Sequence, residues 1–171
     1  MTAKAINWEE IHTWYQWLQE TKIRALKAEL KRCKKISDVY MQPAYVKLVR
    51  HIGGNVDVNS FLPVIAGVLA HTECSNENKE AITLATRMAT KLKQNRPAIS
   101  PLRFKQLLAC EDEDKLLRLL IRIVKQVEFF DIVDFAESLY YWGINGGVKT
   151  KKQWAYNYYT NLSEEFLQKS T

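Results

Sequence analysis

The sequence predicts an all-α protein, a helical bundle of about eight or nine helices in two subdomains. Glycine and proline are scarce, with 6 and 4 among 171 residues, and this scarcity favours helices over turn-rich strand architectures. Apolar residues recur at spacings of three and four, the helical period, rather than in alternation. Hydrophobic residues make up 47% of the chain, which is ample for a buried core and excludes a disordered protein.

Local start and stop signals place the helices of the first half. Asn7 and Glu10 match the N-cap and reciprocal partner of a capping box, so a first helix is expected to open at Asn7. Pro43 fits the first turn of a short helix, which Gly53 ends. The other helices expected here cover about 21–34, a segment opened by Ser60, and about 77–94.

The segment from Asn95 to Pro101 breaks the helical pattern. It predicts the boundary between an N-terminal subdomain, residues 1–95, and a C-terminal subdomain, residues 96–171. The expected C-terminal helices are one over 102–110 capped by Ser100, one that follows an acidic turn at 111–114, one over about 132–142, and a last one opened by Thr150 and Gln153 as a capping box.

The most informative element is the helix that follows the acidic turn. Four cations recur there at spacings of three, four and three residues, and together they are called the ridge: Lys115, Arg118, Arg122 and Lys125. These spacings put all four on one helix face, while leucine, isoleucine and valine cover most of the remaining circumference. A solvated face usually mixes both signs of charge, because like charges at these spacings repel. The pattern therefore favours a polyanion outside the ridge.

Basic residues outside the ridge form further clusters, and the net charge of the chain is +6. A fold can bring such separate clusters together on one surface. In the helix over 21–34, the cationic row lies about 100° from the apolar stripe and flanks it. The candidate nucleic-acid-binding residues are Arg24, Lys27, Lys31, Arg32, Arg87, Lys91, Arg103, Lys105, Lys115, Arg118, Arg122, Lys125, Lys149, Lys151 and Lys152.

The cysteines and the N-terminus indicate the compartment. Cys33, Cys74 and Cys110 lie far apart and form no CxxC pair, and no histidine completes a zinc-binding spacing. We therefore expect reduced thiols, no metal and no cofactor. The N-terminus lacks the apolar run of a signal peptide, and the longest apolar stretch, 61–70, is too short to cross a bilayer. These features predict a cytoplasmic protein without membrane contact.

Signatures of catalysis are missing from the sequence, which contains no GxxxxGK[ST], GxGxxG, GxSxG or HExxH motif. Asp131, Asp134 and Glu137 share one helix face and offer ligands for a divalent metal, but the acidic outer face of a packed helix is the preferred interpretation. Cys110 and His71 are a conceivable nucleophile and base, with nothing in the sequence to pair them. The sequence predicts no enzymatic activity.

Aromatic residues gather near the C-terminus, beside the basic cluster at 149–152. Interleaved aromatic and cationic side chains are able to stack on single-stranded bases. Trp154 and Tyr158, four residues apart, are expected in the core instead. Three further rings stay open to interface or ligand roles: Tyr141, Tyr156 and Tyr159.

Five runs of sequence carry a resemblance through their pattern and order. They are PAYVKLV (43–49), RFKQLL (103–108), LLRLLIRIVK (116–125), YYWG (140–143) and QWAYNYY (153–159). With them the chain resembles the CasB family, the small subunit of the type I-E CRISPR surveillance complex called Cascade. The resemblance covers roughly Trp8 to Leu162 and is strongest from Ser100 onward.

The resemblance implies a non-catalytic subunit that binds nucleic-acid backbone without sequence preference. Such a subunit would stabilise the guide RNA–target hybrid and the displaced strand of the R-loop. Its implied partners are the backbone and large subunits of Cascade, a second copy of itself, guide RNA and target DNA. Two alternatives remain open: a helical protein-interaction adaptor with basic faces, and a small metal-dependent nuclease that uses Asp131, Asp134 and Glu137.

Overall fold

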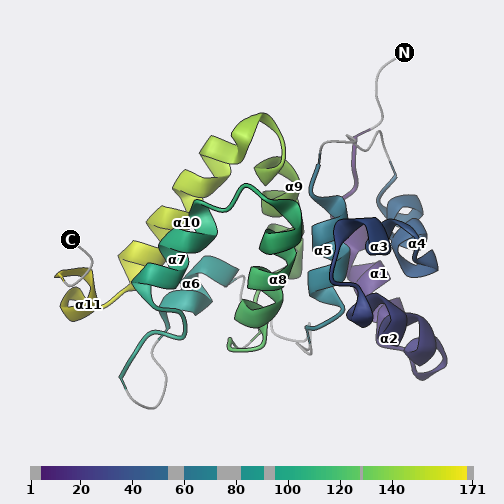
Figure 1. The fold of residues 1–171 in the computed structure, drawn as a ribbon, viewed down its shortest axis with the longest axis horizontal. Coiled ribbons are helices and arrows are strands. Elements are labelled where there is room, and N and C mark those ends of the chain that lie inside the picture. Colours follow the sequence, from purple (N-terminus) through teal and green to yellow (C-terminus); the bar gives the residue numbers. More distant parts are fainter. Residues whose placement is uncertain (1–4, 54–59, 73–81, 91–94, 128, 169–171) are drawn as a thin grey trace.

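The computed structural model describes residues 5–53, 60–72, 82–90, 95–127 and 129–168. These residues form helices and no β-strand, which confirms the all-α prediction (Figure 1). The helices are α1 (Glu10–Leu18), η1 (Thr21–Ile23), α2 (Arg24–Arg32), α3 (Ile36–Tyr40), α4 (Pro43–Ile52), α5 (Leu62–Leu69), α6 (Leu84–Ala89), α7 (Pro101–Leu108), α8 (Glu113–Val124), α9 (Ile132–Trp142), η2 (Asn145–Gly147), α10 (Val148–Asn161) and α11 (Glu164–Gln168). The described part thus contains more helices than expected. The sequence pattern did not predict the short helix α3, and it did not separate α11 from the end of α10.

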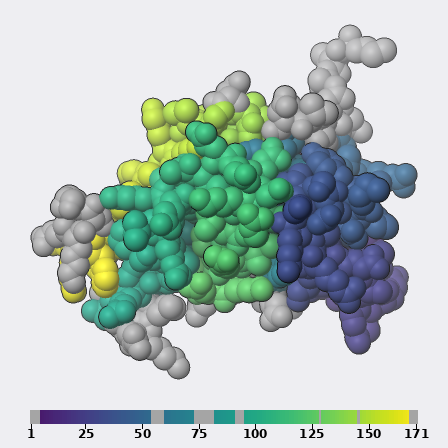
Figure 2. Space-filling view, in the orientation of Figure 1, coloured from purple at the N-terminus to yellow at the C-terminus, as the bar shows by residue number. Residues whose placement is uncertain are grey.

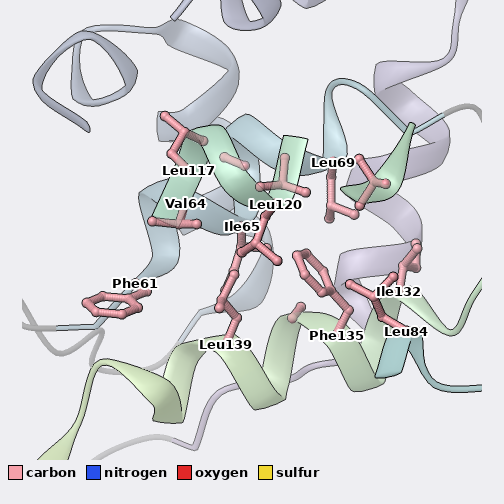
Figure 3. Packing of buried hydrophobic residues seen from close by; sticks show 14 of the residues in the cluster. Phe61, Val64, Ile65, Leu69, Leu84, Leu117, Leu120, Ile132, Phe135 and Leu139 are labelled. Carbon is pink, nitrogen blue, oxygen red and sulfur yellow. The ribbon is translucent and has the colours of Figure 1, made fainter. Parts of the chain in front are cut away.

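Helix α5 lies at the centre of the molecule, between α8 and α9 on one side and the N-terminal helices on the other (Figure 1). All eight of its residues are buried. Figure 3 shows Ile65 of α5 close to Leu120 of α8 and Leu139 of α9. The approach to α8 is tight, because a Cβ added at Gly67 would lie 2.7 Å from Leu117 Cδ1. A helix that is apolar all round is stable only when neighbours cover every side, as they do here.

The N-terminal helices are tied together by buried hydrogen bonds from aromatic side chains. Trp14 Nε1 on α1 donates to the Ala44 carbonyl of α4 at 2.9 Å. The Tyr15 hydroxyl donates to the Thr72 carbonyl, just after α5, at 2.7 Å. Each bond satisfies a polar group that would otherwise be costly to bury, and each fixes α1 against a different neighbour.

The C-terminal helices pack around the segment that the sequence marked as a boundary. Tyr158 of α10 stacks on Phe104 of α7 with ring centroids 4.0 Å apart, and its hydroxyl donates to the Ile99 carbonyl at 2.6 Å. Helix α6 packs against α10, across the boundary expected near residue 95. The division into 1–95 and 96–171 stays a prediction.

Several expected helix starts or lengths were wrong. Ser60 does not open its helix, because α5 begins at Leu62 with Phe61 as its N-cap and no side-chain cap. Helix α1 begins at Glu10 without a side-chain cap, and the Glu10 carboxylate lies 3.5 Å from His51 Nδ1 instead of returning to Asn7. The helix expected over about 77–94 is confined, among the described residues, to α6. The Thr83 side chain caps its start, and Thr90 is extended with its carbonyl accepting from Ala98 N.

The capping box of Thr150 and Gln153 was also wrong. Gly147, in the left-handed conformation, is the N-cap of α10, so the helix begins at Val148 and both residues lie inside it. Gln153 Nε2 donates to Asn157 Oδ1 at 3.1 Å. Other local predictions were confirmed, because Ser100 caps α7 and Gly143 ends α9. No helix among the described residues has the length and apolar character needed to span a membrane.

Candidate nucleic-acid interface

The ridge is built by α8 and exposed as predicted. All four of its cations are exposed, whereas Leu116, Leu117 and Leu120 on the other side of α8 are buried. The start of the helix differs from the expected acidic turn. Asp112 caps α8 by accepting from Lys115 N at 2.9 Å, and the next two acids form the first helical turn. Acids at that end stabilise the helix dipole.

Helix α8 lies beside the segment that joins α2 to α3. An Arg118 guanidinium nitrogen lies 3.5 Å from the Lys34 carbonyl, at the limit of a hydrogen bond. Asp114 Oδ1 accepts a stronger bond from Ile36 N at 2.8 Å. Figure 2 shows the result, since the green surface of α8 meets the dark blue surface of residues 30–45 on one face. The ridge therefore lies beside the segment that follows the basic helix α2, although 84 residues separate Arg118 from Lys34 in sequence.

The other end of the ridge is linked to α2 through His71. His71 lies two residues after the end of α5, and α5 packs against both α2 and α8. Burial lowers the pKa of His71 to about 4, helped by the charges of Lys125, Lys31 and Lys27. Among the described residues, neither ring nitrogen of His71 has a hydrogen-bond partner at ordinary geometry. The backbone of Lys31 is still close enough to raise the pKa slightly and so to offset part of the lowering. Three predicted cations, two on α2 and one just after α8, thus act on a partly buried imidazole that is neutral at pH 7.

A second convergence lies at the start of α8, around Cys110. Burial raises the pKa of this thiol, while Lys115 of the ridge and Lys151 of α10 are close enough to oppose the rise. Lys151 also places its ammonium 5.5 Å from the centre of the Trp142 ring. Lys151 of α10 thus acts on the same thiol as Lys115 at one end of the ridge, and Lys31 of α2 acts on the same imidazole as Lys125 at the other.

The remaining predicted residues occupy several positions. On α2, Arg24, Lys31 and Arg32 are exposed, and Lys27 is half-buried with its ammonium 2.7 Å from Gln19 Oε1. On α7 and α10, Arg103, Lys105, Lys149 and Lys152 are exposed. Arg87 is half-buried and donates through Nε to the Phe129 carbonyl at 2.7 Å. Lys91 lies outside the described residues. The assignment of these side chains to nucleic acid stays a prediction.

Sequence reasoning missed two residues that organise this surface. His71 was considered only as a catalytic base, and Asp114 only as part of a turn. Neither role is visible locally, because each depends on a contact more than 35 residues away: His71 with Lys31 and Lys125, and Asp114 with Ile36. The one local signal at Asp114 is its place just before Lys115, because an acid at the start of a helix stabilises the helix dipole.

The residues considered for catalysis have structural surroundings. Asp131 Oδ1 caps α9 by accepting from Val133 N and Asp134 N. Asp134 and Glu137 line a pocket of about 610 Å³ between α9 and α10. Among the described residues no group of three His, Cys, Asp or Glu is arranged to hold a metal ion. The raised pKa of Cys110 is the opposite of what an activated nucleophile needs.

The aromatic cluster near the C-terminus divides into core and surface. Trp154 and Tyr158 are buried, as predicted. Tyr159 is half-buried and meets Phe104 edge-on at 5.6 Å. Tyr141 and Tyr156 are exposed, so the structure leaves two rings available to a partner.

Comparison with known proteins agrees with the resemblance expected from the sequence. The sequence model of the family described as CRISPR-associated protein Cse2 matches residues 26–159. A chain in a crystal structure of E. coli Cascade bound to a PAM-containing double-stranded DNA target is similar in fold. The TM-score is 0.61 and the identity 19%, over 88% of this chain and 97% of that chain. Comparison with curated proteins found no match. Because the family match spans more than half of the chain, the protein belongs to the Cse2 family, the small subunit (CasB) of type I-E Cascade.

Proposed function

We propose that this subunit is non-catalytic and binds nucleic-acid backbone without sequence preference. In the assembled complex it would stabilise the guide RNA–target hybrid and the displaced strand. The observation that carries the proposal is the convergence of basic segments on α8. Lys31 of α2 meets one end of the ridge beside His71, and Lys151 of α10 approaches the other end beside Cys110. Segments distant in sequence thus place cations near both ends of the ridge.

The state of the ridge side chains fits contact with phosphate. Within the described part of the chain, none of the four forms an ion pair. Four unneutralised like charges on one face repel each other, and a polyanion relieves that repulsion. Binding also releases counterions from the nucleic acid, which supplies affinity without reading bases.

Such contacts suit the energetics of RNA-guided recognition. Base pairing reads the sequence there, and the exchange of duplex for hybrid is nearly balanced in free energy. A few kcal/mol from cationic contacts are therefore enough to decide whether the target strands stay open. A subunit with this task needs exposed lysine and arginine on a rigid support, which the buried α5 gives to α8.

The proposed partners are the backbone and large subunits of Cascade, a second copy of this subunit, guide RNA and target DNA. Membership of the Cse2 family supports the assembly. The similar E. coli chain belongs to a Cascade bound to a double-stranded DNA target, which supports the nucleic-acid partners. We place the subunit in the cytoplasm with that complex.

The test is a double charge reversal on the ridge, Arg118→Glu with Arg122→Glu, in reconstituted complexes. We expect the lifetime of the opened target to fall about tenfold or more, equivalent to about 1.4 kcal/mol. Folding should survive, because exposed substitutions usually change stability by about 0.5 kcal/mol or less. The dependence of affinity on salt should weaken by about 0.7 in log–log slope for each phosphate of a single strand that is no longer neutralised.

The matched control is Lys22→Glu with Arg50→Glu, which makes the same change in net charge at exposed residues outside the predicted set. This variant should keep the wild-type lifetime apart from a small, salt-sensitive effect. Both variants must be shown to enter the complex. An unchanged lifetime in an incorporated ridge variant would count against the proposal and leave the ridge an ordinary solvated face.

A further inference from the structure

Tyr156 of α10 is an aromatic ring without a partner among the residues that the structure describes. It exposes 67% of its surface, although Tyr158 and Tyr159 on the same helix pack on Phe104. Within the described part of the chain it makes no side-chain hydrogen bond and no ring contact. A single exposed ring is common on protein surfaces and would carry no meaning alone. Its surroundings give it one.

A shallow hollow of about 580 Å³ lies beside the ring, lined by Val148, Lys149, Lys152, Gln153 and Tyr156. This volume falls within the range of about 300–1,000 Å³ that small-ligand sites occupy. Lys149, Lys152 and Tyr156 follow spacings of three and four, so they share one face of α10. Both lysines are exposed, and no acidic residue of the described ranges lines the hollow.

We propose that Tyr156 stacks on an unpaired base of a single nucleic-acid strand while Lys149 and Lys152 hold the adjacent phosphates. Every base has a π-face, so stacking of this kind adds affinity without adding sequence preference. The two ammonium groups meet the backbone on either side of the stacked base. The inference rests on the proposed function and deepens it, because it assigns a single-strand site on α10, apart from the ridge.

The other exposed ring of the C-terminal aromatic cluster does not offer the same chemistry. Tyr141 is 47% exposed and borders the neighbouring pocket of about 610 Å³, but Asp134 and Glu137 line that pocket as well. Two carboxylates beside the ring would repel a phosphate backbone. Of the two sites, only the hollow at Tyr156 has a lining whose charged residues are all positive and so attract the phosphate of a nucleotide. Tyr141 therefore serves as an internal control.

The experiment measures binding of the full chain to oligothymidylate and to an abasic strand of the same length, over a series of salt concentrations. We expect Tyr156→Ala to weaken binding to oligothymidylate on the order of 5- to 150-fold, as loss of one stacked base predicts, without changing the salt slope. Tyr156→Phe should keep wild-type affinity. On the abasic strand, the wild type and Tyr156→Ala should bind equally.

The lysines should give the opposite signature. Lys149→Gln with Lys152→Gln should weaken binding to both strands and reduce the salt slope by about 0.7 for each phosphate that is no longer neutralised. Tyr141→Ala should bind as the wild type does. If the wild type binds steeply with salt but Tyr156→Ala binds oligothymidylate within twofold of it, the stacking site is refuted and backbone binding stands. Binding of neither strand would refute both proposals. Equal weakening of both strands by Tyr156→Ala, or Tyr156-dependent capture of an acidic peptide in preference to oligothymidylate, would make the ring a protein contact instead.

Discussion

At the scale of single residues, His71 is the most informative group on the predicted surface. Its imidazole stays neutral because it is buried and because cations approach it from two helices, Lys27 and Lys31 on α2 and Lys125 at the end of α8. The folded-state pKa lies below the unfolded value. The unfolded state therefore binds a proton first as the pH falls below about 6.5. The free energy of unfolding is highest, as far as this group is concerned, above pH 6.5 and decreases as the pH falls toward 4.

We expect Lys125→Gln to raise the pKa of His71 toward its ordinary value, because it removes the largest charge that opposes protonation. The imidazole ring signals in a pH titration by NMR report this pKa directly. Arg103→Gln on α7 is the control and should leave the titration of His71 unchanged. A titration that Lys125→Gln does not move would mean that α2 and α8 do not converge at this residue.

Asp134 presents the reverse case. It is partly buried near Asp131 and Glu137, and burial together with these two charges raises its pKa to about 6. Because this value lies above the unfolded one, the folded state keeps the proton between about pH 4 and 6. Stability is then lost as the pH rises through that window. The neighbouring Asp131 carboxylate accepts two backbone hydrogen bonds as the cap of α9.

Asp134→Asn should therefore stabilise the protein at pH 7.5, by about 1–2 kcal/mol after allowance for solvent screening of a partly exposed group. At pH 4 the substitution should have little effect, since the carboxyl is already neutral there. Urea unfolding at the two pH values measures the difference. Glu111→Gln, at an exposed carboxylate ahead of α8, should change neither value by more than a few tenths of a kcal/mol. Equal effects of Asp134→Asn at both pH values would contradict the argument.

At the scale of elements, the corner between α9 and α10 depends on two adjacent glycines with different surroundings. Gly146 and Gly147 both have positive φ, at 74° and 63°. A Cβ at Gly147 would lie 2.6 Å from the Trp142 carbonyl oxygen, whereas a Cβ at Gly146 would meet nothing within 4 Å. Only the second glycine of the pair is therefore required by packing as well as by conformation.

Gly146→Ala should cost about 1–2 kcal/mol, the ordinary penalty for a left-handed residue with a side chain. Gly147→Ala should cost clearly more, because the added methyl group meets backbone that has no freedom to rotate away. Thermal unfolding of the two variants tests the ranking, and each is the control for the other. Similar losses of stability, or a larger one at Gly146, would show that the corner is not held as described.

The same elements show what the sequence was able to predict. The limits of α9 were predicted correctly from its apolar pattern and the stop at Gly143, whereas the cap formed by Asp131 was not predicted. The start of α10 was wrong, because a Gly147 that packs on Trp142 overrides the capping pattern of Thr150. The ridge was predicted from spacing alone. Its neighbours were not, since the contact of Arg118 with Lys34 depends on how α5 holds both halves together.

At the scale of the whole molecule, α5 joins the two predicted subdomains. It belongs to the first in sequence, yet it packs against α8 and α9 of the second (Figure 3). The apolar surface between them is shared, so neither half covers its own core without the other.

We therefore expect one cooperative unfolding transition for the whole chain. Ile65→Ala, in the shared core, should lower stability by about 2–5 kcal/mol and shift the transition seen by far-UV circular dichroism and by tryptophan fluorescence equally. Val46→Ala on α4, at a side chain 44% exposed, should have little effect. Two separate transitions, of which Ile65→Ala moves only one, would support independent subdomains instead.

The central position of α5 also has a consequence during synthesis. Its apolar residues leave the ribosome before α8 and α9 exist, and about 70 further residues must be made before Trp142 completes the cover. At about 5–20 residues per second, the most hydrophobic segment of the chain waits for about 4–14 s without α8 and α9. A nascent chain in that state is a natural substrate for chaperones, and in a product that stops near Cys110 the side of α5 that faces α8 and α9 stays uncovered. Such truncated chains should collect in the insoluble fraction, while complete chains stay in solution.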